Sequence, residues 1–394
     1  MHWYLLFMTL VIFICSPSWA QVPQIPARSV QSLNPEISLD GLAAAGYFSE
    51  AENLNFGGHD PKNQGFTFQN LELTLGATVD PYARADAHII YLIEDGESVV
   101  ELEEAYLTTL ALPYRLQLIG GQFFTRFGRI NPTHPHSWDF ADQPVINNRL
   151  FEGDGLRNPG IQLSWLTPLP IYLEIIGSIQ NANGETASSF LSVPLEEVGA
   201  HVLGERKVHH LDDLVYMGRV KNAWSLSDTV EMVIGGSGLF GPNASGLDSR
   251  TEIYGVDLYT KWRPLNAQGG FPFVAFQAEG MWRHYEADDI TGIGLPNETL
   301  KDSGFYAQGL WGFAYRWVAG TRVEYTDGNG DNAADPLRDR RLRLSPNLTF
   351  YPSEFSKWRL QYNIDYAEHL NDKALHAVFL QFEFLIGTHG AHVF

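Results

Sequence analysis

The chain has 394 residues, of which 46 are acidic and 26 are basic, so its formal net charge is −20. A chain this acidic repels the phosphate backbone of nucleic acids, and no nucleic-acid partner is expected. Beyond the N-terminal residues there is no run of about 18 apolar residues, which excludes a protein that crosses a membrane with helices. Aromatic residues make up 13% of the chain and 37 residues are glycine. This composition is typical of many short strands joined by turns.

Residues 1–20 have the anatomy of a secretory signal peptide. Leu5 to Ile14 form a short apolar core, and small residues at its end predict cleavage between Ala20 and Gln21. The one cysteine of the chain, Cys15, lies inside this segment. The exported protein is therefore expected to have no thiol, which suits passage through an oxidising periplasm.

From residue 36 onward, apolar and polar side chains alternate with the period of a β-strand. In one stretch, Trp358, Leu360 and Tyr362 share one parity, whereas Arg359 and Gln361 share the other. In a transmembrane barrel the apolar set faces lipid and the polar set faces a wet lumen. A secreted sandwich would alternate as well, but aromatic residues near the strand ends favour the interfacial girdles of a barrel.

The alternation predicts about sixteen strands, within a range of about 14 to 18. Their ranges are 36–49, 66–79, 82–94, 98–111, 115–127, 158–166, 170–181, 211–224, 228–240, 250–263, 271–286, 303–316, 319–327, 340–351, 357–369 and 375–387. Short turns alternate with longer loops, an asymmetry typical of outer-membrane barrels with periplasmic turns and extracellular loops. The predicted fold is therefore all-β. It is a transmembrane antiparallel up-and-down β-barrel over residues 36–394, preceded by a short periplasmic segment over residues 21–35.

One long connection, Gly128 to Arg157, is the candidate constriction of the pore. A barrel of about sixteen strands encloses a lumen wide enough for solutes, so selectivity requires a segment that folds inward. The alternative is an ordinary external loop. Folded inward, Arg126 and Arg129 would form a positive lip. Asp139 and Asp142 would form an acidic lip opposite, so that the electric field runs across the pore. The candidate constriction residues are Arg126, Arg129, His134, His136, Asp139, Asp142 and Arg149.

The predicted closing strand lies at the end of the chain. In it, Val378, Leu380 and Phe382 share one parity, and the C-terminal Phe394 falls in the same parity. A terminal Phe of this kind resembles the signal that the barrel assembly machinery reads. The side chains expected to face the lumen in the last strands are Arg343, Arg359, Gln361, Asn363, Asp365 and Glu383.

Histidine pairs are the candidate metal ligands, because imidazole suits zinc. The pairs are His134 with His136, His209 with His210, and His389 with His392. None of them has a third ligand at a fixed spacing, so neither a bound metal nor a cofactor is predicted. No nucleophile elbow or acid–base motif stands out, and the chain is not expected to be an enzyme.

Two segments carry a resemblance to known families, GGQFFTRFGRINPTHPHSWDFADQP and the ending FLQFEFLIGTHGAHVF. They resemble bacterial outer-membrane porins of the phosphate-selective O and P type. They are more similar still to the short proteins labelled zinc-regulated TonB-dependent outer membrane receptors. The resemblance implies an outer-membrane channel or uptake component that is expressed under metal limitation. A TonB-dependent transporter has about 22 strands and a folded plug, and the residues before 36 are too few for a plug.

The predicted function is passive diffusion of small hydrophilic solutes or ions through an outer-membrane porin, used under metal or nutrient limitation. Two alternatives stay open: a zinc-regulated, receptor-like metal uptake protein, and a structural or adhesive barrel without transport. The expected partners are the outer membrane with its lipopolysaccharide, the barrel assembly machinery and the solutes. Porins of this size commonly trimerise, so a homotrimer is a candidate assembly.

Overall fold

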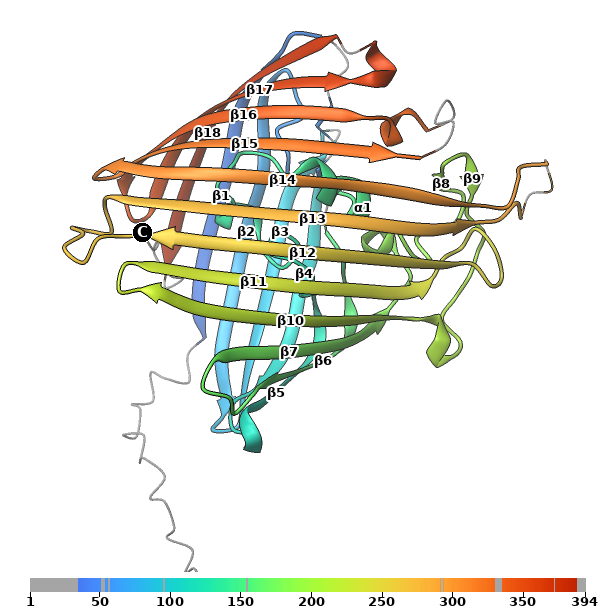
Figure 1. The fold of residues 1–394 in the computed structure, drawn as a ribbon, viewed down its shortest axis with the longest axis horizontal. Coiled ribbons are helices and arrows are strands. Elements are labelled where there is room, and N and C mark those ends of the chain that lie inside the picture. The colour runs from blue at the N-terminus through green and yellow to red at the C-terminus, as the bar shows by residue number, and fades with distance from the viewer. Residues whose placement is uncertain are drawn as a thin grey trace, which may run out of the picture.

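The computed structural model describes residues 35–50, 54–55, 57–94, 96–153, 155–290, 292, 294–329, 335–371 and 373–387. The predicted cleavage site at Ala20 and Gln21 and the C-terminal Phe394 lie outside these residues. Within them, sixteen antiparallel strands form one closed barrel (Figure 1). It closes where the first strand, β1 (Glu36–Phe48), pairs with the last, β18 (Ala374–Gly387). The predicted fold class is confirmed.

The strands follow one another around the barrel in chain order. The others are β2 (Gly65–Asp80), β3 (Ala83–Glu94), β4 (Glu97–Thr109), β5 (Leu116–Phe124), β6 (Arg157–Leu166), β7 (Tyr172–Asn181), β10 (Leu214–Ser227), β11 (Val230–Pro242), β12 (Arg250–Trp262), β13 (Phe273–Ala287), β14 (Glu298–Ala314), β15 (Trp317–Gly328), β16 (Arg341–Ser353) and β17 (Ser356–Ala367). Every predicted strand overlaps one of these. The largest difference is the start of β14, which lies at Glu298 instead of 303 because Glu298 extends the pairing with Ala287.

The two faces of the wall differ in the way that a membrane barrel requires. On β18, Val378, Leu380 and Ile386 point outward and are 38%, 45% and 59% exposed. Phe379, which points inward, is fully buried. Because the ring is closed, each strand pairs with a neighbour on both sides, as a sheet surrounded by lipid must. The outward apolar parity of the last strand therefore supplies the lipid-facing surface.

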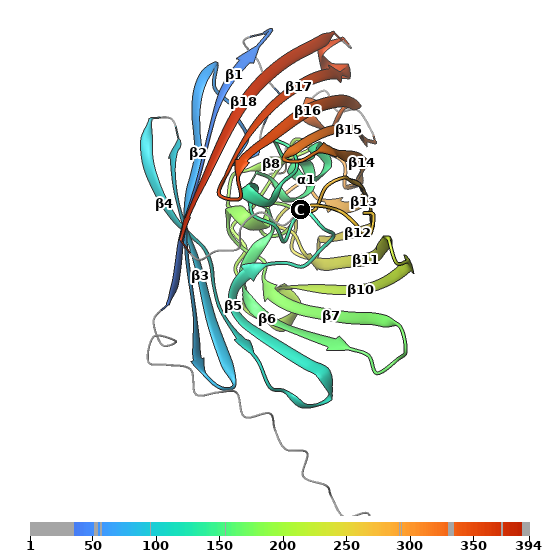
Figure 2. The ribbon, with the colours of Figure 1, turned by 90° about the vertical axis from the view of Figure 1, so that its left-hand side faces the viewer.

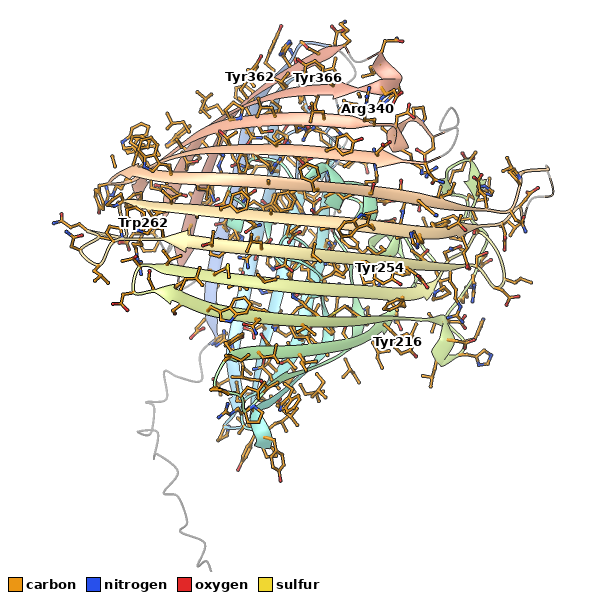
Figure 3. All side chains as sticks on the ribbon, in the orientation of Figure 1. Tyr216, Tyr254, Trp262, Arg340, Tyr362 and Tyr366 are labelled. Carbon is orange, nitrogen blue, oxygen red and sulfur yellow. The ribbon has the colours of Figure 1, made fainter. Side chains whose placement is uncertain are left out.

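The two ends of the barrel differ in their connections. At the short-turn end, where β1 begins and β18 ends, the turns include residues 81–82, 228–229, 315–316 and 354–355. From the opposite, long-loop end start the connections of residues 49–64, 125–156, 182–213 and 329–340. On the outer surface, Trp262 lies toward the short-turn end, and Tyr216 and Tyr254 lie toward the long-loop end (Figure 3). These positions fit aromatic side chains at the two membrane interfaces.

The connections contain the remaining short elements. The 3-10 turns are η2 (Pro113–Arg115), η3 (Pro135–Ser137), η4 (Glu185–Ala187), η5 (Leu211–Asp213), η6 (Pro336–Arg338) and η7 (Glu368–Leu370). One α-helix, α1 (Val145–Phe151), and a separate hairpin of β8 (Glu197–Val198) and β9 (His201–Val202) complete the described part. No helix among these residues is long and apolar enough to cross a bilayer.

The largest apolar core lies inside the barrel. It forms between residues 125–156, which we call the inner loop, residues 182–213, and the inner faces of β7 and β10–β14. Figure 2, a view along the barrel, shows α1 of the inner loop within the ring of strands. The core members include Phe127, Ile146, Phe151, Phe190, Met217, Leu239, Ile253, Met281 and Tyr306. The inner wall is polar along β15–β17 and β2–β4. Along β10–β14, buried apolar side chains such as Met217 and Leu239 lie beside buried charged ones such as Arg219 and Glu279.

Candidate pore constriction

The inner loop enters the barrel directly after β5, where a clamp joins its two ends. The backbone N–H of Thr125 donates to the carbonyl of Leu156 at 2.9 Å. The side chain of Asn131 donates to both of these residues' carbonyls, at 2.7 and 3.1 Å, and accepts from Leu156 N–H at 2.8 Å. Gly128 adopts φ = 61°, a left-handed conformation that glycine tolerates. The chain therefore leaves the wall at Phe124 and returns to it at Arg157 as a closed unit.

Asp142 attaches the inner loop to the strands near the C-terminus. Its carboxylate lies 2.6 Å from Nη2 of Arg322 and 2.9 Å from Nη1 of Arg343. It also accepts hydrogen bonds from the side-chain amides of Gln361 at 2.7 Å and Asn363 at 2.6 Å. Burial disfavours the carboxylate, but the two guanidinium groups outweigh burial and hold the pKa of Asp142 below its usual value.

The acidic lip expected from Asp139 and Asp142 is therefore not what the structure contains. Asp142 is fully buried and neutralised, so it anchors the loop instead of facing solutes. Asp139 is also tied to the wall, because Gln308 donates to its carboxylate and Asn347 to its backbone carbonyl, each at 2.8 Å. Burial raises the pKa of Asp139 against the opposing effect of nearby cations such as Arg359.

The six residues predicted to face the lumen all lie on the inner face of the wall. They are Arg343, Arg359, Gln361, Asn363, Asp365 and Glu383, each less than 5% exposed. Several of them contact the inner loop directly. Arg359 donates to the carbonyl of Trp138 at 2.8 Å, and the side-chain oxygen of Gln361 accepts from Ala141 N–H at 2.7 Å. The polar parity of the last strands thus serves to dock the loop.

The inner loop also carries histidines that contact carboxylates of β2 and β4. Nδ1 of His134 lies 2.8 Å from Glu103, and its Nε2 lies 3.0 Å from Glu104. Nδ1 of His136 lies 3.0 Å from Glu72. Burial disfavours the charged ring of His134, but the carboxylates of Glu103 and Glu72 outweigh burial and raise the pKa of His134 well above its ordinary value. The loop is therefore held by two groups of strands, β15–β17 and β2–β4.

The three arginines expected at the constriction lie in different places. Arg129 donates from Nε to Gln277 at 3.1 Å, and its guanidinium lies 4.4 Å from the ring centroid of Tyr259. Arg126 lines a cavity toward the short-turn end. Arg149 donates to the carbonyl of Asp339 at 2.9 Å, toward the long-loop end. Burial, with nearby guanidinium groups and against the carboxylate of Asp302, lowers the pKa of Arg149 to about 10. Arg126 and Arg129, which were expected to form a positive lip, thus have different surroundings.

Two cavities lie on either side of the inner loop. One has a volume of about 350 Å³ and is bordered by residues near the long-loop end, among them Arg149, Arg338 and Asp339. The other has a volume of about 350 Å³ and is bordered by residues near the short-turn end, among them Arg84 and Arg126. His134 borders the second cavity and Val145 the first, so the inner loop separates them.

Several residues of this site were missed by reasoning from the sequence. Glu72, His88, Glu103 and Glu104 of β2–β4 contact the loop histidines, and none of the four was among the residues expected in the pore. The strand period gave the side of the wall on which such residues lie. The strand period does not show which strands a loop will contact when it folds across the barrel.

Comparisons with known proteins agree with this architecture. No family model matches the chain. An uncharacterized protein of Aquifex aeolicus is 32% identical over 363 residues, which cover 86% of this chain and 73% of the relative. The chain belongs to the same family as this protein. Because this relative is uncharacterized, membership of the family does not assign an activity.

Solved structures with the same fold are outer-membrane proteins. The outer membrane channel DcaP of Acinetobacter baumannii superposes with a TM-score of 0.59 at 12% identity, covering 90% of this chain and 98% of DcaP. The trimer form of OmpT, an outer membrane protein of Vibrio cholerae, has a TM-score of 0.52 at 7% identity and covers 90% and 99% of the two chains. At such identities the likeness establishes the fold. The chain thus has the same closed-barrel fold as these two outer-membrane proteins.

Proposed function

We propose that the protein is an outer-membrane channel through which small hydrophilic solutes or ions diffuse passively. The observation that carries the proposal is the inner loop, which is docked across the lumen of a closed sixteen-strand barrel between two cavities. A sixteen-strand barrel is otherwise wide enough for an aqueous passage, and an inward segment narrows it. The walls next to the loop are polar along β15–β17 and β2–β4, a lining that suits hydrophilic solutes, whereas the apolar core lies against β7 and β10–β14.

The charges around the cavity at the long-loop end favour a channel without single-sign selectivity. Its lining contains four basic and four acidic residues: Arg149, Arg283, Arg338, Arg341, Glu152, Glu197, Asp335 and Asp339. The guanidinium groups of Arg283 and Arg338 share the carboxylate of Asp302, at 2.7 and 3.1 Å. Positive charge is therefore matched locally, and a solute that carries hydrogen-bonding groups of either kind finds partners here.

Planar bilayers test the proposal directly. The refolded full-length protein should insert with stepwise increases in current, and its reversal potential across a salt gradient should lie near that of a weakly selective pore. Liposomes that contain the protein should swell in small sugars and swell more slowly as the sugar grows. A barrel that folds, inserts and passes neither ions nor sugars would contradict the proposal and favour a structural or adhesive barrel.

The setting follows from the same fold. We propose that the protein is exported by its signal peptide, is inserted by the barrel assembly machinery and lies in the outer membrane beside lipopolysaccharide. The trimer form of OmpT makes a homotrimer the assembly to test first. Use of the channel under metal or nutrient limitation, which the sequence resemblance implies, would appear as slower growth of a deletion strain on limiting zinc. Equal growth of the two strains would oppose that use.

A further inference from the structure

A compact cluster of possible metal ligands lies where the inner loop meets the wall. Glu72 of β2, His88 of β3 and His134 of the inner loop each offer one ligand atom, and these atoms lie within 4.8 Å of one another. Glu72 and His88 are 1% and 8% exposed. The three residues come from segments far apart in the sequence, and only the folded barrel brings them together.

The side chains of this cluster already converge. Nδ1 of His88 lies 2.8 Å from Oε1 of Glu72, and Nδ1 of His134 lies 3.4 Å from Oε2 of the same carboxylate. The two imidazole rings stack with centroids 4.5 Å apart and planes at 26°. Both rings are therefore held against one buried carboxylate, and small rotations would point their nitrogens at a common ion.

We propose that Glu72, His88 and His134 bind a divalent transition-metal ion of the zinc type. Two imidazoles and one carboxylate are a donor set that zinc accepts, and its fourth tetrahedral position remains for water or a solute group. Glu104 adds an outer partner, since its Oε2 lies 3.0 Å from Nε2 of His134, the ring nitrogen that does not face Glu72. A carboxylate that touches a ligating histidine orients the ring and strengthens the ligand.

The charge of the surroundings supports a cation at this place. Three carboxylates meet here, and Glu72, Glu103 and Glu104 are 1%, 1% and 7% exposed. The carboxylate of Glu103 faces Nδ1 of His134 at 2.8 Å and Nε2 of His59 at 3.8 Å. The guanidinium of Arg157 approaches Glu103 only to 3.9 Å. Buried negative charge is costly unless it is paired. A divalent ion bound by the histidines would add two positive charges beside these three carboxylates.

The ion also has a route to the cluster. His88, His134 and Glu104 border the cavity of about 350 Å³ toward the short-turn end. Because Glu72 and His88 belong to the wall and His134 belongs to the inner loop, a bound ion would tie the loop to the wall. Metal binding of this kind stabilises the docked loop, whatever solute the channel carries.

The test uses untagged, refolded full-length protein in detergent, titrated with zinc chloride in a calorimeter and with cobalt chloride under visible spectroscopy. Wild type should bind about one equivalent, and cobalt should give the absorption of a tetrahedral site. His88→Asn and Glu72→Gln should weaken binding about 100-fold or more, because even the loss of an outer partner costs about 10- to 100-fold. His209→Asn, at an exposed histidine of the long-loop end, is the matched control and should bind as wild type does.

Two results would overturn the proposal: no zinc binding by wild type, or equal binding by wild type and His88→Asn. Folding of each variant is checked by its heat-dependent shift on a gel, and His88→Asn keeps the test usable if the buried Glu72 variant does not fold. Zinc should also raise the temperature of that shift for wild type and His209→Asn but not for His88→Asn, since a ligand of the folded state stabilises it. An absent rise in wild type would contradict the tie between loop and wall. Neither readout requires a conducting channel, so failure here is distinct from failure of the proposed function.

Discussion

Replacing Asp142 by Asn should release the inner loop from the strands near the C-terminus. Asp142 is fully buried and contacts Arg322 at 2.6 Å and Arg343 at 2.9 Å. Removing one member of a buried ionic contact costs about 3 to 5 kcal/mol. Arg322 keeps Glu324 at 2.8 Å and Arg343 keeps Asp365 at 2.9 Å, so we expect the lower end, about 3 kcal/mol. That cost lowers the ratio of docked to undocked loop about 100-fold.

The assay is the single-channel current of Asp142→Asn beside wild type. A loop that leaves its position part of the time should give a larger mean conductance and more open-channel noise, and it should expose the loop to protease. Asp248→Asn, the same change at an exposed residue of a loop between β11 and β12, is the control and should match wild type. Conductance, noise and protease resistance all unchanged in Asp142→Asn would refute the claim that this contact holds the loop.

Three further predictions concern pH, orientation and the outer face. Burial, aided by the carboxylate of Asp142, raises the pKa of Asp60 from 3.8 to about 6. Its contribution to loop docking is therefore complete below pH 3.8 and is lost as pH rises through about 6, a change of about 3 kcal/mol. The open-channel noise of wild type should increase between pH 4 and pH 7.5, and the increase should be smaller in Asp60→Asn. Noise that does not depend on pH in wild type would contradict this role of Asp60. Cysteine at Leu247, 87% exposed in a connection at the long-loop end, should react with an impermeant thiol reagent on intact cells. Cysteine at Leu265, 79% exposed at the short-turn end, should not react. The reverse result would invert the topology. Leu360 lies on the outer face and is 50% exposed. Leu360→Arg should lower the free energy of unfolding in the membrane by about 2 to 4 kcal/mol, so that less folded barrel is seen on a gel. An unchanged yield of folded barrel would argue against a lipid-facing site.

The strands were predictable because each carries its own signal. Along β17, Trp358 and Leu360 are 43% and 50% exposed, whereas Arg359 and Gln361 between and beside them are buried. One face in lipid and one face inside require this period, and it is readable over any stretch of about ten residues. The sixteen-strand ring follows once the strands are marked, because only closure satisfies the backbone of the edge strands.

The contents of the barrel were less predictable. Helix α1 has seven residues and no side-chain cap at its first turn, so the local sequence contains no clear helix signal. The alternation of apolar and polar residues is weak on β11, because apolar residues lie on both of its faces. Ile234 is 41% exposed on the outer face, and Leu239 is buried in the core on the inner face. The histidine pair of the inner loop was visible, but its partners Glu72 and His88 depend on which strands a loop reaches across the barrel.

The attachment of the inner loop to both walls has a consequence for the order of assembly. Ala141 bonds to Gln361, a residue 220 positions further along the chain, whereas His134 bonds to Glu104, only 30 positions earlier. Contacts of such long range form late, after the chain between them has been placed. One anchorage is thus available as soon as the early hairpins exist, and the other must wait for the final strands. The burial of Asp142 during folding would therefore mark the step at which the last strands close the ring.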